Sequence, residues 1–453
     1  MADPIVVIIG AGPAGVRAAQ TLAGAGLRPI LFDEAERPGG QIYRQPPGGV
    51  SAQTTVYGFE ARKAGAIHRT LGDLADAVDY RPRTLVWNLF QDRLDLLTVQ
   101  GYGEQRFNRL ILATGAMDRV LPFPGWTLPG VFTLGAAQIA FKAQGVSIGR
   151  RVALIGAGPL LPLVADQYAT AGAEVVAVLD TTPFLTKVRH APGLLTESTT
   201  FAKGLWYTAR NKLRGLNVRY GVQALRAEGA RQVEALVFRD RAGKEHRIAC
   251  DGIGASFGLR SEAQLADLAG CAFGFDAVER QWRPQTTQEG RSSVPAIYLA
   301  GDGARIGGAD IAELQGRRTA LAVLEDLGRR VAPSETGDLD RALKRQAGFR
   351  RALEAAYPFP THLLDDVGDD EIVCRCEGVT AGALRRAACD QDAPEVNRLK
   401  ALTRVGMGRC QGRVCGHVAA ELLARARGCP IESVGRLRAQ PPIKPIPVLG
   451  GDA

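Results

Sequence analysis

The chain lacks any run of apolar residues that approaches the roughly 18 needed for a membrane-spanning helix, so no transmembrane segment is expected. Its first residues, MADPIVVIIG, begin a strand-like pattern at once, without the basic start and cleavage site of a secretory signal. No basic stripe or aromatic platform accompanies the formal charge of +9, which argues against nucleic acid as a partner. We therefore expect a cytoplasmic protein, and 453 residues predict two to four domains.

Histidine and cysteine are scarce. The five histidines show no metal-ligand spacing, and each is expected to be a surface or capping residue: His68, His190, His246, His362 and His417. Four of the eight cysteines stand singly and are expected to fill core positions: Cys250, Cys271, Cys389 and Cys429. The other four form two close pairs. In a reducing compartment, paired cysteines indicate a metal or redox site in preference to structural disulfides.

The N-terminus carries a glycine fingerprint in a strand–helix–strand context. The apolar run at 5–9 predicts a buried parallel strand, a helical pattern covers 14–24, and PILF predicts a second strand. Such a unit binds a dinucleotide, with the pyrophosphate at the helix N-terminus. Asp33 is expected to bind the ribose, and Glu34 is the neighbouring candidate. The fingerprint residues are Gly10, Gly12, Pro13, Ala14 and Gly15.

Three further motifs resemble the flavoprotein family with two dinucleotide folds, over residues 1 to about 330. They are RPGGQIYR (37–44), LILATGA (110–116) and AIYLAGDGARIGGADIAELQG (296–316). The resemblance implies FAD and a discontinuous FAD domain, with Asp302 in the ribityl–pyrophosphate region. It adds these cofactor-binding candidates: Gly40, Gln41, Arg44, Ala113, Thr114, Gly115 and Gly301. The disulfide-reductase mechanism of that family is excluded, since no cysteine precedes Cys250.

A second strand–helix–strand pattern begins at residue 151. Gly156 and Gly158 occupy the first two fingerprint positions, but Leu161 stands at the third, where it would push the helix from the strand. Asp180 ends the second strand and is the ribose candidate there. The departure leaves three interpretations of this fold open: NAD(P)H, a structural adenine nucleotide, or no nucleotide.

The paired cysteines lie near the end of the chain, as C-x-C and C-x4-C. Close pairs can supply two thiolates each to one metal centre, either structural zinc or iron–sulfur. Flanking arginines favour a [2Fe–2S] centre, because they can offset its negative charge: Arg375, Arg409 and Arg413. The predicted ligands are Cys374, Cys376, Cys410 and Cys415. Three short helices are expected around them, beginning near residues 380, 395 and 415.

The stretch from residue 372 to 430 resembles the bacterioferritin-associated-ferredoxin-like [2Fe–2S] domain. The full chain resembles the A-type subunits of opine oxidases, hydroxyproline or proline dehydrogenases, and hydrogen cyanide synthase. The expected fold is α/β, with two Rossmann-like domains and a small helical [2Fe–2S] domain. The expected boundaries are 1–120 with 290–332 for FAD, 121–289 for the second fold, 333–370 for a connector that PSETGD interrupts, 371–435 for the cluster domain, and 436–453 for a tail.

This resemblance implies an FAD and [2Fe–2S] electron-transferring subunit of an amino- or imino-acid dehydrogenase. Its implied partners in a hetero-oligomer are an FAD subunit similar to amino-acid oxidases and a small ferredoxin-like subunit. The residues that oxidise the substrate are then expected on another polypeptide. Two alternatives remain open: a self-contained NAD(P)H:acceptor oxidoreductase, and a non-catalytic iron–sulfur binding or regulatory module.

Overall fold

A computed structural model describes residues 3–46 and 56–448. The first of two dinucleotide-type folds is built on a five-stranded parallel sheet in the order β20-β7-β1-β2-β3. The strands are β1 (Val6–Ile9), β2 (Ile30–Phe32), β3 (Asp79–Arg81), β7 (Arg109–Leu112) and β20 (Ile297–Leu299). Because β20 comes almost 190 residues after β7, the first fold is discontinuous in sequence.

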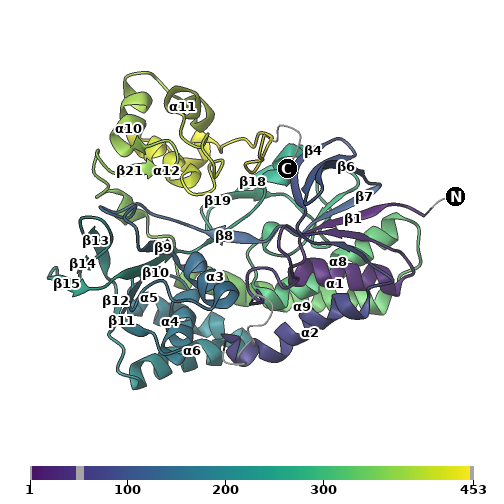
Figure 1. The fold of residues 1–453 in the computed structure, drawn as a ribbon, viewed down its shortest axis with the longest axis horizontal. Coiled ribbons are helices and arrows are strands. Elements are labelled where there is room, and N and C mark those ends of the chain that lie inside the picture. Colours follow the sequence, from purple (N-terminus) through teal and green to yellow (C-terminus); the bar gives the residue numbers. More distant parts are fainter. Residues whose placement is uncertain (1–2, 47–55, 449–453) are drawn as a thin grey trace.

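Two helices that pack on each other, α1 (Pro13–Gly24) and α8 (Ala309–Asp326), cover one face of this sheet (Figure 1). The glycine fingerprint explains the close fit of α1, since a Cβ on Gly15 would lie 1.8 Å from the carbonyl oxygen of Gly10. Gly10 itself has φ +105°, which an L side chain rarely adopts. The remaining elements of this fold are α2 (Ala61–Asp73) and the antiparallel β4 (Leu85–Phe90), β5 (Arg93–Thr98) and β6 (Gly101–Arg106).

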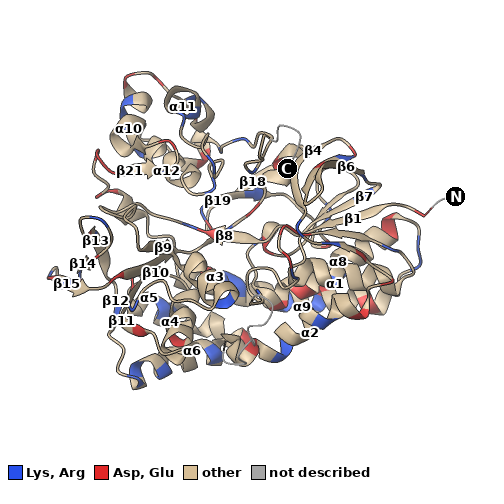
Figure 2. Cartoon of the chain, viewed as in Figure 1, with Lys and Arg blue, Asp and Glu red and all other residues tan. Residues whose placement is uncertain are grey.

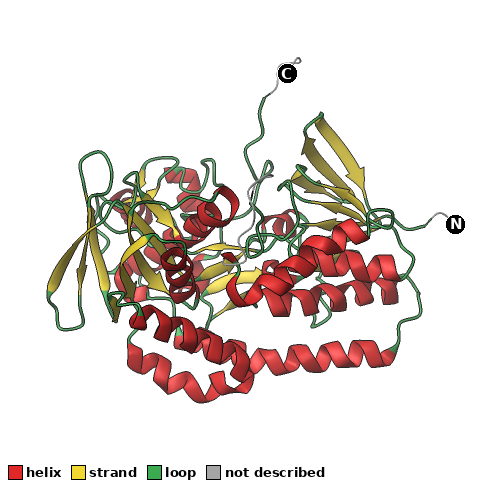
Figure 3. Ribbon diagram, turned by 60° about the horizontal axis from the view of Figure 1, so that its bottom comes forward, coloured by secondary structure: helices red, strands yellow, loops and turns green. Residues whose placement is uncertain are grey.

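The second fold has a parallel sheet in the order β12-β11-β10-β16-β9. Its strands are β9 (Val131–Thr133), β10 (Arg151–Ala157), β11 (Glu174–Asp180), β12 (Val218–Tyr220) and β16 (Gly252–Phe257). Its helices are α3 (Leu134–Gln144), α4 (Leu160–Thr170), α5 (Phe184–Leu194) and α6 (Ser198–Leu213). An antiparallel sheet extends from it, made of β13 (Gln223–Glu228), β14 (Ala235–Arg239) and β15 (Glu245–Ala249). Figure 3 shows one antiparallel sheet at each end of the molecule and most helices on one side.

Two antiparallel strands connect the two folds: the chain leaves the first fold through β8 (Ala116–Asp118) and returns through β17 (Leu259–Ser261). We call this pair the β8–β17 crossing. A short helix and a hairpin follow the return to the first fold: α7 (Gln264–Leu268), β18 (Phe273–Asp276) and β19 (Gln281–Pro284). Next comes the long helix α9 (Pro333–Ala356). The expected break at PSETGD is wrong, because these residues form the first turns of α9, with Pro333 at its first position, where a missing N–H costs nothing.

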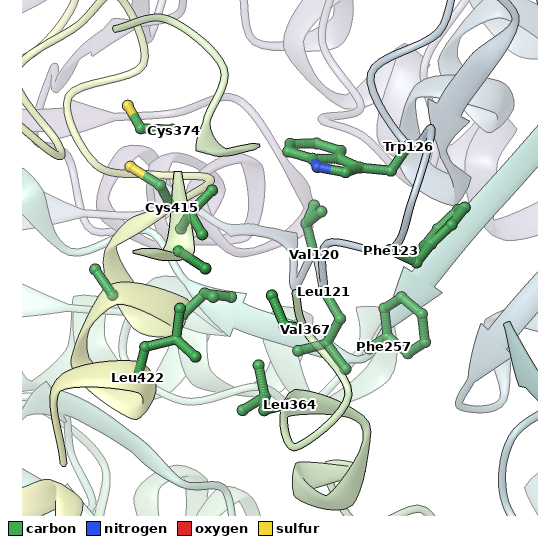
Figure 4. Packing of buried hydrophobic residues seen from close by; sticks show 14 of the residues in the cluster. Val120, Leu121, Phe123, Trp126, Phe257, Leu364, Val367, Cys374, Cys415 and Leu422 are labelled. Atoms are coloured by element: carbon green, nitrogen blue, oxygen red, sulfur yellow. The ribbon is translucent and has the colours of Figure 1, made fainter. Parts of the chain in front are cut away.

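The C-terminal domain contains three short helices, as the sequence predicts, and a two-stranded ribbon. The elements are β21 (Ile372–Cys374), β22 (Val379–Thr380), α10 (Ala381–Cys389), α11 (Val396–Thr403) and α12 (Gly416–Ala426). This domain shares one continuous apolar core with the second fold (Figure 4). Trp126 belongs to this core and donates its indole N–H to the carbonyl of Ile372 at 2.7 Å, which ties the two units together.

None of the helices in the described part of the chain combines the length and the apolar character needed to cross a membrane. Lys and Arg are mixed with Asp and Glu throughout the chain (Figure 2). This mixture matches the dispersed charge expected from the sequence.

Candidate functional site: a flavin cavity beside four cysteines

A cavity of about 640 Å³ opens at the carboxyl ends of the first parallel sheet. This volume is within the range of small-molecule and cofactor sites. The helix N-termini at Pro13 and Ala309 both border it, so that free backbone N–H groups can receive an anionic pyrophosphate. Arg44 also lines the cavity, and its buried Nε has no partner among the described residues. The cavity therefore fits the FAD that the motifs predict.

All but one of the residues predicted to bind FAD line this cavity. They are Gly10, Gly12, Pro13, Ala14, Asp33, Glu34, Gly40, Gln41, Arg44, Ala113, Thr114, Gly115, Gly301 and Asp302. The exception, Gly15, lies behind the turn and allows α1 to approach the strand.

The carboxylates of Asp33 and Asp302 accept hydrogen bonds from backbone N–H groups. Asp33 accepts from Ala11 at 2.5 Å and from Ala35 at 2.7 Å, and burial raises the pKa of its carboxyl group. One oxygen of Asp302 accepts from Gly307 at 2.7 Å and from Gly308 at 2.9 Å. Both carboxylates are thus oriented before any ligand binds.

The four predicted cluster cysteines come together in a row of contacts. The Cys415 thiol hydrogen-bonds to Cys374 and to Cys410, and Cys410 contacts Cys376. Cys374 and Cys415 are buried side by side at the edge of the shared core (Figure 4). In the described part of the chain, no three His, Cys, Asp or Glu side chains converge on one point as ligands of a single metal ion. Two close pairs of cysteines can supply two thiolates to each iron of a two-iron centre.

Backbone N–H groups surround these sulfurs. Glu377 and Gly406 direct N–H groups at Cys374, and Gly412 and Val414 direct theirs at Cys410. Together with the Cys415 thiol, which is the larger influence, these groups lower the pKa of Cys374 to about 6 and of Cys410 to about 5. Hydrogen bonds with both neighbours raise the pKa of Cys415, and burial raises that of Cys376. Cys374 and Cys410 are therefore the thiols that most readily become thiolates, the form that iron requires.

The cysteine site and the flavin cavity share a wall. Cys410, Arg413 and Val414, all from the second cysteine pair, line the flavin cavity. Arg413 forms a two-point ion pair with Glu262 of the flavin fold, with N–O distances of 2.6 Å and 3.2 Å. Both side chains are only 14% exposed, so this contact holds the cysteine loop against the cavity.

The arginines near the cluster are arranged differently from the sequence-based expectation. The charge of Arg413 is largely neutralised by Glu262, and the guanidinium of Arg375 lies 5.7 Å from the ring centre of Trp126. Arg260, which the sequence did not single out, is partly buried, and the charges of Glu262, Cys415 and Cys410 act on it. No local motif marks Arg260, because strand β17 is brought beside the cysteines only by the fold.

Two expectations about single residues are wrong. Cys389 is exposed, since it stands at the last position of α10, whose buried face is formed by Leu384, Ala387 and Ala388. His417 is neither a surface nor a capping residue. It lies at the start of α12, and burial together with Arg260 holds the pKa of its imidazole well below the usual range. Cys250 and Cys271 are buried, as expected.

The expected tail packs back onto the flavin fold. Leu437 fills a space bordered by Gly406, Gly412 and Gly416 of the cysteine loops. Further along, Ile443 and Lys444 line the flavin cavity, Ile443 N–H donates to the carbonyl of Trp87 at 3.0 Å, and Lys444 pairs with Glu34. The sequence carries no signal for this, because residues 436–448 form no helix or strand and are placed by tertiary contacts alone.

The predicted nucleotide-binding residues of the second fold do not line the flavin cavity, although the neighbouring Leu160 does. Gly156, Gly158 and Asp180 are buried, and Leu161 packs in an apolar core with Leu134 and other residues of α3 and α4. Both Asp180 oxygens are engaged: one accepts from the N–H of Thr182 at 2.8 Å, and the other forms an ion pair with Lys187. The Lys187 ammonium lies 4.7 Å from the ring centre of Tyr357, the residue that follows α9.

Comparisons with known proteins show which families the chain matches. Residues 4–316 match the pyridine nucleotide-disulphide oxidoreductase family, and residues 372–425 match the BFD-like [2Fe-2S] binding domain. The chain is 36% identical to the A-type subunit of opine oxidase from Rhizobium meliloti, covering 97% of this chain and 86% of that protein. It is 34% identical to hydrogen cyanide synthase subunit HcnB of Pseudomonas aeruginosa, covering 97% of each. The fold is similar to that of L-proline dehydrogenase from P. horikoshii, with a TM-score of 0.71 at 20% identity over 98% of this chain and 78% of that one.

Proposed function

Since the chain belongs to the pyridine nucleotide-disulphide oxidoreductase family and carries a BFD-like [2Fe-2S] binding domain, we propose that it is the electron-transferring subunit of an amino- or imino-acid dehydrogenase. It is an FAD-dependent oxidoreductase with a [2Fe–2S] centre. In the proposed reaction, electrons arrive from a substrate-oxidising flavoprotein partner and leave for an acceptor. The observation that carries the proposal is the wall shared by the flavin cavity and Cys410.

The residues of this chain bring the two redox sites together. The Arg413–Glu262 ion pair fixes the cysteine loop, and backbone N–H groups at Cys374 and Cys410 favour negative charge on sulfur. FAD can take up two electrons together and release them one at a time, and a [2Fe–2S] centre carries single electrons. Placing both on one chain converts a two-electron oxidation into one-electron steps.

The partner is proposed to be an FAD subunit similar to amino-acid oxidases, with a small ferredoxin-like subunit as the third component of the hetero-oligomer. The names of the relatives support a hetero-oligomer, since the opine oxidase and hydrogen cyanide synthase relatives are both named as subunits. The proposed substrate class, an amino or imino acid, is carried over from the opine oxidase relative.

NADH is not the proposed electron donor. A ribose-binding acid must be accessible at the strand end, as Asp33 is where it lines the flavin cavity. Asp180 is only 3% exposed, and its oxygens are occupied by Lys187 and the Thr182 N–H. This arrangement argues against the self-contained NAD(P)H oxidoreductase, and the flavin cavity argues against a non-catalytic iron–sulfur module.

The experiment compares the isolated holoprotein with the chain co-expressed with an amino-acid-oxidase-like subunit. Proline, hydroxyproline and an opine are supplied with an artificial electron acceptor. The isolated chain should show little turnover, and the co-purified complex should turn over at least one of these substrates. Full turnover by the isolated, homogeneous chain would refute the proposal.

Variants then test the electron path inside the complex. With Cys410→Ser, the partner flavin should still be reduced by substrate, but the acceptor should no longer be reduced. Cys389→Ser is the matched control, because Cys389 is exposed and lies outside the row of four cysteines. Unchanged acceptor reduction in Cys410→Ser would show that the cysteine site does not lie on the path.

A further inference from the structure

A second, smaller cavity lies between the β8–β17 crossing and helix α12. Its volume is about 100 Å³. Met117, Glu262 and Arg413 line both this cavity and the flavin cavity, so the two are neighbours. None of the predicted cofactor-binding or cluster-ligating residues lines it.

Two arginines in its wall form no ion pair with any described residue. Arg119 is 5% exposed, and no described carboxylate lies within ion-pair distance of Arg119 or Arg260. The acids of the wall are already paired, Glu262 with Arg413 and Asp267 with Arg436. Burying unpaired charge is costly, so the cavity wall has a net positive charge that calls for an anion.

Several residues that line the same cavity carry unpaired polar atoms. Each is a buried side-chain atom without a hydrogen-bond partner among the described residues: Arg119 Nε, Ser261 Oγ, Gln264 Oε1, Trp282 Nε1, and Nδ1 and Nε2 of His417. Each such atom costs about 1 to 3 kcal/mol if it stays unsatisfied. Several of them on one small cavity indicate that a ligand or ordered water completes the hydrogen bonds.

The cluster does not account for this charge. Cys415 and Cys410 act on Arg260, so a bound [2Fe–2S] centre would offset part of its charge. The charges that act most strongly on Arg119 are instead Arg260, Glu279, Glu421 and Arg280. Glu279 and Glu421 are themselves paired with other arginines, Glu279 with Arg305 and Glu421 with Arg280. The direct contacts of the Arg119 guanidinium are neutral, namely the Leu259 carbonyl at 3.4 Å and the Phe359 ring centre at 4.8 Å, so Arg119 has no directly paired carboxylate even with the cluster in place.

We propose that this cavity binds a small oxyanion, a phosphate or a carboxylate, held by Arg119 and Arg260. Guanidinium groups recognise both anions through paired N–H donors, and the Trp282 N–H and the Ser261 hydroxyl are further donors at the same cavity. A volume of about 100 Å³ accommodates a group of this size and excludes a nucleotide. The anion lies beside the flavin cavity, in the part of the molecule where the flavin fold meets the cluster domain.

Isothermal titration calorimetry on the holoprotein tests the site, in chloride buffer at constant ionic strength. Inorganic phosphate and acetate are titrated separately, and ion chromatography of the denatured protein measures any anion retained from purification. Binding of one equivalent of either ion, or release of one equivalent, is expected. Phosphate alone would identify a phosphate site, and acetate alone a carboxylate site.

Arg119→Gln should weaken the binding at least about tenfold, the usual effect of losing a hydrogen bond to a charged group. Ser261→Ala is a milder second variant and should weaken it less. Arg241→Gln is the control, because this arginine is exposed in the β14–β15 turn and its replacement removes the same charge. FAD and iron contents confirm that each variant is folded. Neither binding nor retained anion in the wild type, or equal affinity in Arg119→Gln, would overturn the proposal.

Discussion

Asp267→Asn should release the C-terminal segment, residues 436–448, from the flavin cavity. The Asp267 carboxylate is 4% exposed and accepts two hydrogen bonds from Arg436, both at 2.7 Å. It also accepts the Ala439 N–H at 2.6 Å and pairs with Arg438 at 3.0 Å. One carboxylate on α7 therefore anchors the start of the segment.

The size of the effect follows from the burial of the pair. Removing one partner of a fully buried ion pair costs about 3 to 5 kcal/mol, because the other charge is left unpaired. Arg436 is 18% exposed and Arg438 is 63% exposed, so water can partly solvate them and the cost is lower. We expect about 2 to 3 kcal/mol, which corresponds to an opening equilibrium that increases by about 30- to 150-fold.

Hydrogen exchange measures this opening directly. The reporter is the Ile443 N–H, which is protected by its bond to the Trp87 carbonyl. Its exchange should accelerate by the same factor in Asp267→Asn, and FAD should dissociate faster because Ile443 and Lys444 line its cavity. Asp166→Asn is the matched control: Asp166 is 7% exposed between two arginines of the second fold. Unchanged exchange at Ile443 in Asp267→Asn, or equal acceleration in the control, would refute the reasoning.

The same contact predicts the pH dependence. The pKa of Asp267 is lowered in the folded protein: burial alone would raise it, but the hydrogen bonds from Arg436 and Ala439 outweigh burial. A depressed pKa means that the stabilisation is fully present above the unfolded value, near 3.9, and is lost as pH falls through the folded value. Protection of Ile443 that depends on Asp267 should therefore be constant from pH 7 to about pH 5 and disappear only below about pH 4.

Three further predictions concern the redox sites. Metal and sulfide analysis should find about two iron and two sulfide per chain. Cys410→Ser should lose both but retain FAD, and Cys389→Ser should keep the iron and sulfide content unchanged. Stoichiometric zinc without sulfide would contradict this prediction. Under anaerobic conditions, NADH should reduce the FAD slowly or not at all. Leu161→Ala should lower the free energy of unfolding by about 2 to 5 kcal/mol but should not accelerate the reduction of FAD by NADH, because Asp180 stays paired with Lys187. Arg260→Gln should make the midpoint potential of the cluster more negative in redox titration, since it removes a positive charge near Cys415, and an unchanged potential would contradict that role.

The parts of the fold that could be predicted from sequence are those with local signals. Strands β1 and β2 are continuous apolar runs, and glycines stand at the starts of α1 and α8. Two of the three helices of the cluster domain begin at capping residues, since the side chains of Thr380 and Glu395 accept backbone N–H groups at the starts of α10 and α11. The cysteine spacing predicted which thiols come together, because two close pairs on opposite loops are readily joined.

The errors have a common physical cause. Whether Cys389 or His417 is buried depends on which face of a short helix meets another element, and composition does not determine this. The PSETGD stretch has few helix-forming residues, yet α9 contains it because packing of the whole helix outweighs local propensity. The path of residues 436–448 depends on a buried carboxylate about 170 positions earlier in the chain. Interactions at that separation leave no trace in a local pattern.

The second fold also supports the cluster domain. Its core residues Ile155, Leu236 and Phe238 belong to the same apolar cluster as Val418 and Leu422 of α12. The cluster domain therefore packs on this fold through a shared core, and the Trp126–Ile372 hydrogen bond adds a directional contact. A support of this kind fixes the four cysteines relative to the flavin cavity, which is the placement that electron transfer between the two sites requires.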